Sequence, residues 1–270
     1  MKKRAFTFFR YFFLIVVSLL SIFPLFWMLI ASTNTSQGVL SGTLLPGTNL
    51  AANYKSLLES QDVWGAMRNS FTYATGQTLL AMTICSLAGY GFEIYHTKGK
   101  DRVMSVLLVT MMVPFAATMV PLFQMVSKMG LLNSAWGFML PGISTPFLIM
   151  LFRQSARSFP HDIIEAARID GLNELQIFYR MFIPTMRSTY AAAMTITFMN
   201  AWNNYLWPKI IMLDGKSLTM PMLTANLIAG YVTDYGAMML AVLLSTMPTV
   251  LIFFLLQKSF AEGVAGAVKG

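Results

Sequence analysis

Charged side chains are scarce in this sequence. Only 11% of the 270 residues are charged and 56% are hydrophobic, whereas about 25% of the residues of an ordinary soluble domain are charged. The few charges are also clustered, which leaves long uncharged runs between them. This composition argues against a soluble globular protein and favours one that is embedded in a membrane.

Cysteine is nearly absent as well. Cys85 is the single one, so the sequence excludes an intramolecular disulfide and a cysteine-based zinc site. We also find no metal-ligand cluster, no glycine-rich phosphate loop and no nucleophile–base pair. We therefore predict a chain that is not an enzyme, binds no cofactor and cannot itself hydrolyse ATP by the usual machinery.

Six long apolar runs dominate the sequence. A membrane-crossing helix needs about 20 apolar residues, whereas a β-barrel strand would be about 10 residues long with alternating polarity. Because lipid cannot satisfy open backbone groups, we predict an all-α integral membrane protein. The first run is too long for a signal peptide and is predicted to be a retained span. The predicted spans are residues 11–31, 69–92, 103–126, 133–152, 188–208 and 235–257.

The basic residues give the chain a net charge of +8. A basic chain can bind nucleic acid, but here the basic residues are scattered through short loops, and no nucleic-acid partner is expected. Most of them lie in the two terminal segments and in the second and fourth loops between spans. Because cytoplasmic loops are enriched in Lys and Arg, both termini and the long fourth loop are predicted to be cytoplasmic.

Proline and glycine interrupt several predicted spans. Broken helices at membrane depth are tolerated where they are buried in protein or line a cavity. Ordinary kinks and a bundle that is built to move both account for the pattern. The interrupting residues are Pro24, Gly89, Pro114, Pro121, Pro141, Pro146 and Pro248.

The fourth loop, residues 159–187, predicts two short helices that meet at a glycine. Asp162 is predicted as an N-cap with Glu165 three residues on, and Asn173 with Gln176 repeats this capping pattern. Gly171 suits the left-handed position that ends a helix. Apolar residues recur at helical spacing and imply a partner, either the rest of the bundle or another protein. They are Ile163, Ile164, Ala167, Leu172, Leu175 and Phe178.

A motif in this loop resembles the EAA loop of ABC importer permeases. Glu165, Ala166 and Ala167 are followed by Gly171 after three residues, and Ile183-Pro184 comes eleven residues later. The resemblance implies the type I ABC importer permease fold, in which this loop forms cytoplasmic coupling helices that dock on an ATP-binding subunit. Glu165 would pair with a basic residue there, or close its capping box, or do both. The residues implied in docking are Glu165, Ala166, Ala167, Asp170, Gly171, Leu172 and Leu175.

The resemblance extends over most of the chain. The six-span plan and the Gly/Ala-rich tail, residues 259–270, look like the second permease subunit of the maltose-type carbohydrate uptake branch. The implied domain is a single permease, residues 1–270, with a core at about 69–258, in the bacterial cytoplasmic membrane. Its implied partners are membrane lipid, a second homologous permease, an extracytoplasmic sugar-binding protein and two ATP-binding subunits, which bind the ATP and Mg. A flexible tail would contact these ATP-binding subunits through Gly266, Val268 and Lys269, unless it is only a frayed end.

Span five carries the candidate substrate path. In helical projection Asn200, Asn203, Asn204 and Trp207 share a face. Asparagine supplies hydrogen-bond donors and acceptors for sugar hydroxyls, and aromatic rings supply a flat apolar surface. An interfacial aromatic belt is the alternative. The common family form has Asp where Asn204 stands. Gln77 and Gln124 are weaker candidates, because such residues also bond helices to one another.

Three rival functions remain at this stage. A secondary transporter would normally show ionisable residues within its spans, and a membrane-embedded enzyme would need a catalytic set. The third rival is a permease of the same architecture for a solute other than a sugar.

Overall fold

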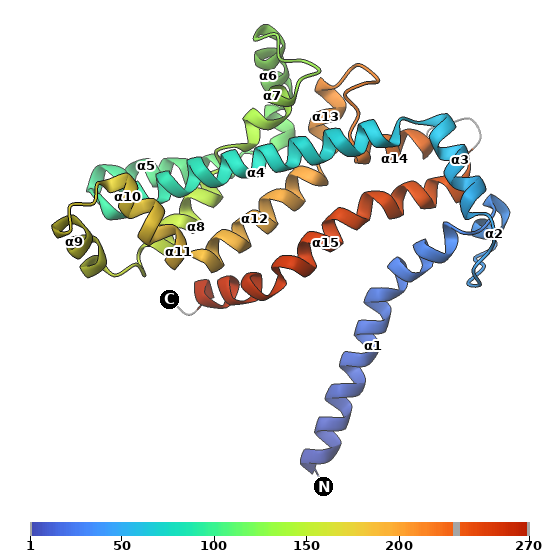
Figure 1. Ribbon diagram of the computed structural model, residues 1–270, viewed down its shortest axis with the longest axis horizontal. Coiled ribbons are helices and arrows are strands. Elements are labelled where there is room, and N and C mark those ends of the chain that lie inside the picture. The colour runs from blue at the N-terminus through green and yellow to red at the C-terminus, as the bar shows by residue number, and fades with distance from the viewer. Residues whose placement is uncertain (1, 229–232, 269–270) are drawn as a thin grey trace. The chain divides into compact units, whose positions relative to one another are not determined.

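The computed structural model describes residues 2–228 and 233–268, and within these ranges the chain forms helices and loops without a β-strand (Figure 1). The chain divides into two units. The described residues of Met1–Trp64 and Leu223–Pro248 form the first unit, and those of Gly65–Met222 and Thr249–Gly270 form the second.

The first unit contains three helices that precede the long second run. They are α1 (Lys2–Ala31), α2 (Ser36–Leu40) and α3 (Leu50–Ser60), followed much later in the chain by the first part of α15 (Tyr235–Val268). The Asn53 amide nitrogen donates to the carbonyl oxygens of Ser32, at 2.8 Å, and Asn34, at 2.9 Å. These bonds satisfy two carbonyls of the turn that follows α1 and so fix α3 to this turn.

Asp234 closes the same unit from the other end of the chain. Its two carboxylate oxygens accept hydrogen bonds from the Ser36 hydroxyl, at 3.0 Å, and the Ser56 hydroxyl, at 2.9 Å. Burial raises the pKa of the Asp234 carboxyl, but hydrogen bonds from the Ala237 N–H and the two serines outweigh burial, so the pKa lies below its usual value. The start of α15 is thereby fixed to α2 and α3.

The remaining helices lie wholly or mainly in the second unit, except α14, of which residues 220–222 belong to the second unit and 223–228 to the first. They are α4 (Val63–Ile94), α5 (Lys98–Thr110), α6 (Phe115–Lys128), α7 (Ala135–Met139), the 3-10 turn η1 (Leu140–Gly142), α8 (Pro146–Ala156), α9 (His161–Ile169), α10 (Glu174–Ile177), the π-helical turn η2 (Phe178–Phe182), α11 (Ile183–Thr185), α12 (Arg187–Trp202), α13 (Leu206–Ile211) and α14 (Met220–Ile228).

Two predicted spans are broken rather than continuous. The run at 103–126 is divided into α5 and α6, which meet at 100°, and the run at 133–152 is divided into α7–η1 and α8, which meet at 50°. Proline explains both breaks, since it lacks an N–H and disfavours helix in the residue before it. Pro114 directly precedes α6, and Pro146 is the first residue of α8.

The span count of six stays a prediction. Among the described residues, Phe6–Ala31 and Tyr235–Leu255 are long and apolar enough to cross a membrane, and four spans result if each bent pair counts as one. The fifth run does not form one helix, because α12 ends at Trp202 after 16 residues. The last helix continues past the predicted end of span six to Val268. Gly266 and Val268 therefore lie in a helix instead of a flexible tail, and Lys269 lies outside the described residues.

Helices α4 and α8 approach each other closely in the second unit. A Cβ atom built on Gly89 would lie 2.7 Å from the Arg153 backbone nitrogen and 2.9 Å from the Ile149 carbonyl oxygen. The fully buried side chains of Cys85 and Phe152 continue this contact. Only glycine at position 89 leaves room for the backbone of α8.

We expect Gly89→Ala to destabilise the protein by about 1–3 kcal/mol, the usual cost of overpacking, because the methyl group would push α8 away. The matched control is Gly91→Ala on the same helix, where an added Cβ meets nothing within 4 Å. The control should be neutral or slightly stabilising, since alanine favours helix. Thermal unfolding of the purified variants in detergent measures the difference. Equal melting of the two variants would contradict this account of the α4–α8 contact.

Candidate functional site

The loop at residues 159–187 begins with helix α9, whose start differs from the prediction. The N-cap is Pro160 and no side chain caps the helix, so the predicted capping box of Asp162 and Glu165 is wrong. The extended backbone of Pro160 (ψ 122°) lets the helix begin at His161, which places Asp162 inside the first turn. There its carboxylate faces the positive end of the helix dipole, and Glu165 is an exposed side chain.

The turn after α9 is confirmed as a glycine turn. Gly171 has φ +79°, and the Leu172 N–H donates to the Ala167 carbonyl oxygen at 3.0 Å while the Gly171 N–H donates to Arg168. This is a Schellman ending. The predicted capping box of Asn173 and Gln176 is also confirmed, with both of its bonds at 2.9 Å. We call α9, this turn and α10 the EAA hairpin.

An ion pair ties the two arms of the EAA hairpin together. Arg168 Nε donates to Glu174 Oε1 at 2.8 Å across the turn. Arg168, and then the Tyr95 hydroxyl, hold the pKa of the Glu174 carboxyl below its usual value. Tyr95 follows the end of α4, so this polar contact also connects the EAA hairpin to α4.

One face of the EAA hairpin packs on its own bundle. Ile164 and Ala167 of α9 and Ile177 of α10 are buried in a cluster with Phe178 and Tyr90. The rings of Tyr90 and Phe178 meet edge to face with centroids 5.3 Å apart. The partner of these buried apolar residues is therefore the rest of the bundle, one of the two alternatives that the sequence left open.

The opposite face of the EAA hairpin is uncovered and partly apolar. Ile169 is 86% exposed and Leu175 is 61% exposed, and they flank the Gly171 turn. Glu165 and Ala166 of α9 and its C-cap residue Asp170 are exposed as well. A rigid turn that presents large apolar side chains beside charged ones is typical of a docking surface.

A cluster of charges at the ends of α4, α5 and α8 was not predicted from the sequence. Arg153 of α8 donates through Nε to Glu93 Oε2 of α4, at 3.0 Å, and through Nη2 to Asp101 Oδ1 of α5. Arg157 Nε lies 3.4 Å from Glu93 Oε1, and His96 Nε2 lies 2.9 Å from Asp101 Oδ2. The only signal in the sequence was that Glu93 and Arg153 each lie at the end of an apolar run.

Three of the predicted path residues come together at the end of α12. Asn200, Asn203 and Asn204 line a depression of about 390 Å³ with Tyr205, Leu206 and Phe115. Helix α12 ends here, with the Asn203 amide donating to the Met199 carbonyl oxygen and Asn204 Oδ1 accepting from the Trp207 N–H. Phe115 of α6 was not predicted, because only the bend at Pro114 brings it to α12. We call this depression the asparagine pocket.

The other candidate path residues do not line the asparagine pocket. Trp207 is buried, and its indole N–H donates to the Gly137 carbonyl oxygen at 3.0 Å. Trp207 does not share a helix face with Asn200, as the projection predicted, because α12 ends at Trp202. Gln77 is buried with its amide against Gly142, which is a packing role, and Gln124 is exposed on α6.

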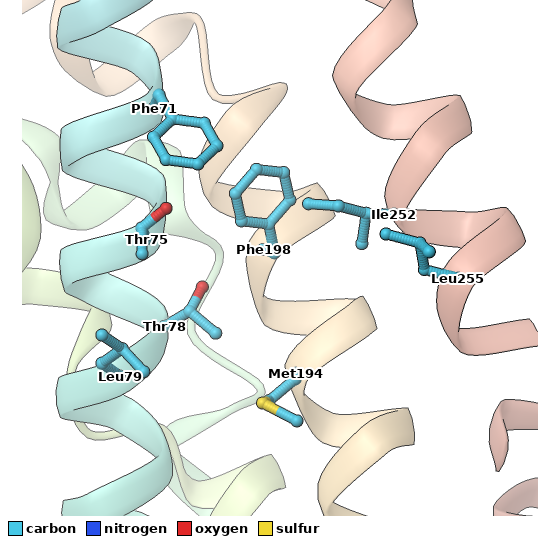
Figure 2. A pocket seen from close by; sticks show the side chains of 8 residues that line it. All are labelled: Phe71, Thr75, Thr78, Leu79, Met194, Phe198, Ile252 and Leu255. Atoms are coloured by element: carbon cyan, nitrogen blue, oxygen red, sulfur yellow. The ribbon is translucent and has the colours of Figure 1, made fainter.

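A second cavity, of about 300 Å³, has a different character (Figure 2). Its lining comes from α4, α12 and α15, and the polar side chains among it are Thr75 and Thr78. The Thr78 hydroxyl already donates to the Ala74 carbonyl oxygen at 2.6 Å. This lining offers almost no hydrogen bonds to a polar solute, so the asparagine pocket is the better candidate for solute recognition.

Comparison with known proteins assigns the class that the helices and the hairpin define. A family model described as binding-protein-dependent transport system inner membrane component matches residues 86–266. The chain belongs to this family, and is therefore a multi-pass permease component of an inner membrane. Its fold is that of an ABC importer permease, since a solved bacterial ABC transporter involved in the import of the acidic polysaccharide alginate matches with a TM-score of 0.81 at 20% identity, over 96% of this chain and 98% of that chain.

Two relatives narrow the class further. The lactose transport system permease protein LacG of Rhizobium radiobacter is 44% identical, over 96% of this chain and 95% of the relative. The arabinooligosaccharides transport system permease protein AraQ of Bacillus subtilis (strain 168) is 32% identical, over 96% of this chain and 94% of the relative. This chain is thus similar along nearly its whole length to permeases that are named for sugar transport.

We expect Gly171→Ala to loosen the EAA hairpin, since a left-handed backbone costs an L-residue about 1–2 kcal/mol. Gly171→Asn is the matched control, because asparagine tolerates this conformation. Protease cleavage between residues 159 and 187 should be about 5- to 30-fold faster in the alanine variant, the factor that this free energy gives. It should change little in the asparagine variant. Cleavage of the alanine variant at the wild-type rate would mean that the turn does not depend on the glycine.

Proposed function

We propose that this chain is the permease subunit of an ATP-driven, binding-protein-dependent importer that moves a sugar or a short oligosaccharide across the cytoplasmic membrane. The observation that carries the proposal is the EAA hairpin, in which one face packs on the bundle and the other exposes Ile169 and Leu175. Such a surface fits a separate protein, and the resemblance of the motif at Glu165 and Gly171 to the EAA loop supports an ATP-binding subunit as that protein.

ATP hydrolysis belongs to the partners in this proposal. Two ATP-binding subunits bind the ATP and Mg, and a second, homologous permease completes the membrane part. The sequence supports this division, because we find no phosphate-binding loop in it. Closure of the ATP-binding subunits would move the EAA hairpin and turn the bundle between inward-facing and outward-facing states, a rigid-body change.

The orientation follows from the charges. With both termini and the EAA hairpin in the cytoplasm, the positive-inside rule is satisfied. An extracytoplasmic sugar-binding protein would then deliver the solute to the outer side. Helix α15 runs about 16 Å past the predicted end of span six, at 1.5 Å per residue, and this extension supports contact of Gly266, Val268 and Lys269 with the ATP-binding subunits.

The asparagine pocket supports a sugar as the solute. Three asparagine side chains provide paired donors and acceptors, and Phe115 and Tyr205 provide rings for the apolar faces of a pyranose. Both named relatives carry sugars in their names, which favours a sugar over another solute. Tyr205 also fits an interfacial belt, so transport itself has to separate the two roles.

The decisive experiment is reconstitution of the complex with its companion subunits in proteoliposomes. ATPase activity should rise when a sugar and the binding protein are added, and uptake should require ATP. Lactose and an arabinooligosaccharide are the first solutes to test. Uptake that follows an ion gradient and ignores ATP would overturn the proposal in favour of a secondary transporter.

We expect Leu175→Asp to weaken association with the ATP-binding subunits by about 10-fold or more, because docking would bury the new carboxylate against apolar surface, at a cost above the roughly 1.4 kcal/mol that corresponds to tenfold. The chain should still fold, since an aspartate suits the first turn of α10. Leu45→Asp is the matched control, because Leu45 is 75% exposed and lies outside the EAA hairpin. Co-purification at a series of salt concentrations measures the loss. Equal retention of the subunits by both variants would count against docking at Leu175.

We expect Asn203→Ala with Asn204→Ala to lower the transport rate while the complex still assembles. These substitutions also remove two local hydrogen bonds, so Asn200→Ala is the cleaner variant. This variant should also lower the transport rate. Gln124→Ala, exposed on the neighbouring helix α6, serves as the control. Uptake of radiolabelled sugar at several concentrations measures the rate. An unchanged rate and solute range in all the asparagine variants would remove the asparagine pocket from the path.

A further inference from the structure

The guanidinium of Arg153 is an unusual group in this chain because it is charged and almost fully buried. Its side chain is 5% exposed, and its carboxylate partners Glu93 and Asp101 are 17% and 45% exposed. Desolvation of a buried guanidinium is costly and is repaid only by good geometry. An apolar side chain would stabilise this contact at lower cost, which indicates that the charges specify a particular arrangement of helices.

The arrangement that Arg153 specifies is the junction of three helix ends. Arg153 lies in the last turn of α8, Glu93 in the last turn of α4 and Asp101 in the first turn of α5. One planar guanidinium donates to two carboxylates from two different helices, a geometry that a lysine cannot reproduce. The close approach of α4 and α8 at Gly89 adds a steric constraint to the electrostatic one.

The same end of α4 also holds the EAA hairpin. Tyr90 lies one turn before Glu93 and is buried in one cluster with Ile164 and Ala167 of the hairpin. Its ring also contacts those of Phe178 and Phe182, which directly follow the hairpin, with centroids 5.3 Å and 5.0 Å away. Two residues after Glu93, the Tyr95 side chain lies close enough to the Arg168–Glu174 pair to lower the pKa of the Glu174 carboxyl. The last turn of α4 is therefore fixed to Arg153 on one side and to the EAA hairpin on the other.

We propose that Arg153 is a positioning residue for energy coupling. It keeps the ends of α4, α5 and α8 together with the EAA hairpin, so that a displacement of the hairpin moves the three helices at once. This inference rests on the proposed docking of ATP-binding subunits to the hairpin. Without the guanidinium, the carboxylates of Glu93 and Asp101 lose their common partner and repel each other. The hairpin's exposed face is unchanged, so ATP is still hydrolysed, but the motion is no longer passed to the bundle.

The test is the ratio of sugar transported to ATP hydrolysed in proteoliposomes that contain the whole complex. We expect Arg153→Gln to keep its ATP-binding subunits and its ATPase activity but to lower this ratio by roughly tenfold, within the range found for coupling mutations. Arg153→Lys keeps the charge and should give an intermediate ratio. Arg157→Gln is the matched control, because Arg157 is half-exposed and its ion pair reaches Glu93 of α4 but not Asp101 of α5. Its ratio should stay near that of the wild type.

Glu93→Gln provides a second route to the same readout if Arg153→Gln does not fold. It removes the other half of the ion pair and should also lower the ratio. A wild-type ratio in the variants of both residues, or parallel losses of ATPase and transport at a constant ratio, would overturn the positioning role. Failure of the proposed function would look different, because the wild-type complex itself would then show no ATP-dependent uptake.

Discussion

The whole structure depends on one constraint, which is that backbone groups in lipid must find their hydrogen bonds within the protein. Helices satisfy it, and the long α1, α4 and α15 are its direct result. Proline interrupts helical hydrogen bonding at defined places, and the resulting bends bring together residues that a straight span would keep apart. The bend before Pro114 places Phe115 at the end of α12, where it lines the asparagine pocket with Asn203 and Asn204.

The EAA hairpin solves a related problem at the membrane boundary. A docking element has to be rigid, yet it must leave its contact face uncovered. Burying Ile164, Ala167 and Ile177 against the bundle provides the rigidity, and the Schellman turn and capping box fix the two arms. Ile169 and Leu175 then remain available to a partner. Packing on the bundle is confirmed for the buried face, and binding of a partner stays a prediction for the exposed face.

Local signals carried most of what the sequence predicts correctly. The turn at Gly171 and the capping box of Asn173 and Gln176 depend on residues close by in the chain. The local sequence is therefore enough to predict them. The predicted N-cap at Asp162 is wrong because the helix begins two residues earlier, with Pro160 as its N-cap. Trp207 does not line the asparagine pocket. The helical projection assumed that the helix continues to Trp207, but α12 ends at Trp202. The roles of Phe115 and Arg153 were not predicted, for another reason. Their partners lie at least 50 residues away in the sequence, and nothing in one sequence records such contacts.

Helix α12 joins the two ends of the proposed mechanism. Its first residue, Arg187, follows the chain that leaves the EAA hairpin, and Asn200 near its other end lines the asparagine pocket. Its 16 residues span about 24 Å. A helix of that length moves as a rod, so a displacement at the hairpin reaches the pocket without a chain of side-chain rearrangements. Coupling then depends on whether the neighbouring helices move with this rod. That is the condition which the buried guanidinium of Arg153 meets for α4, α5 and α8.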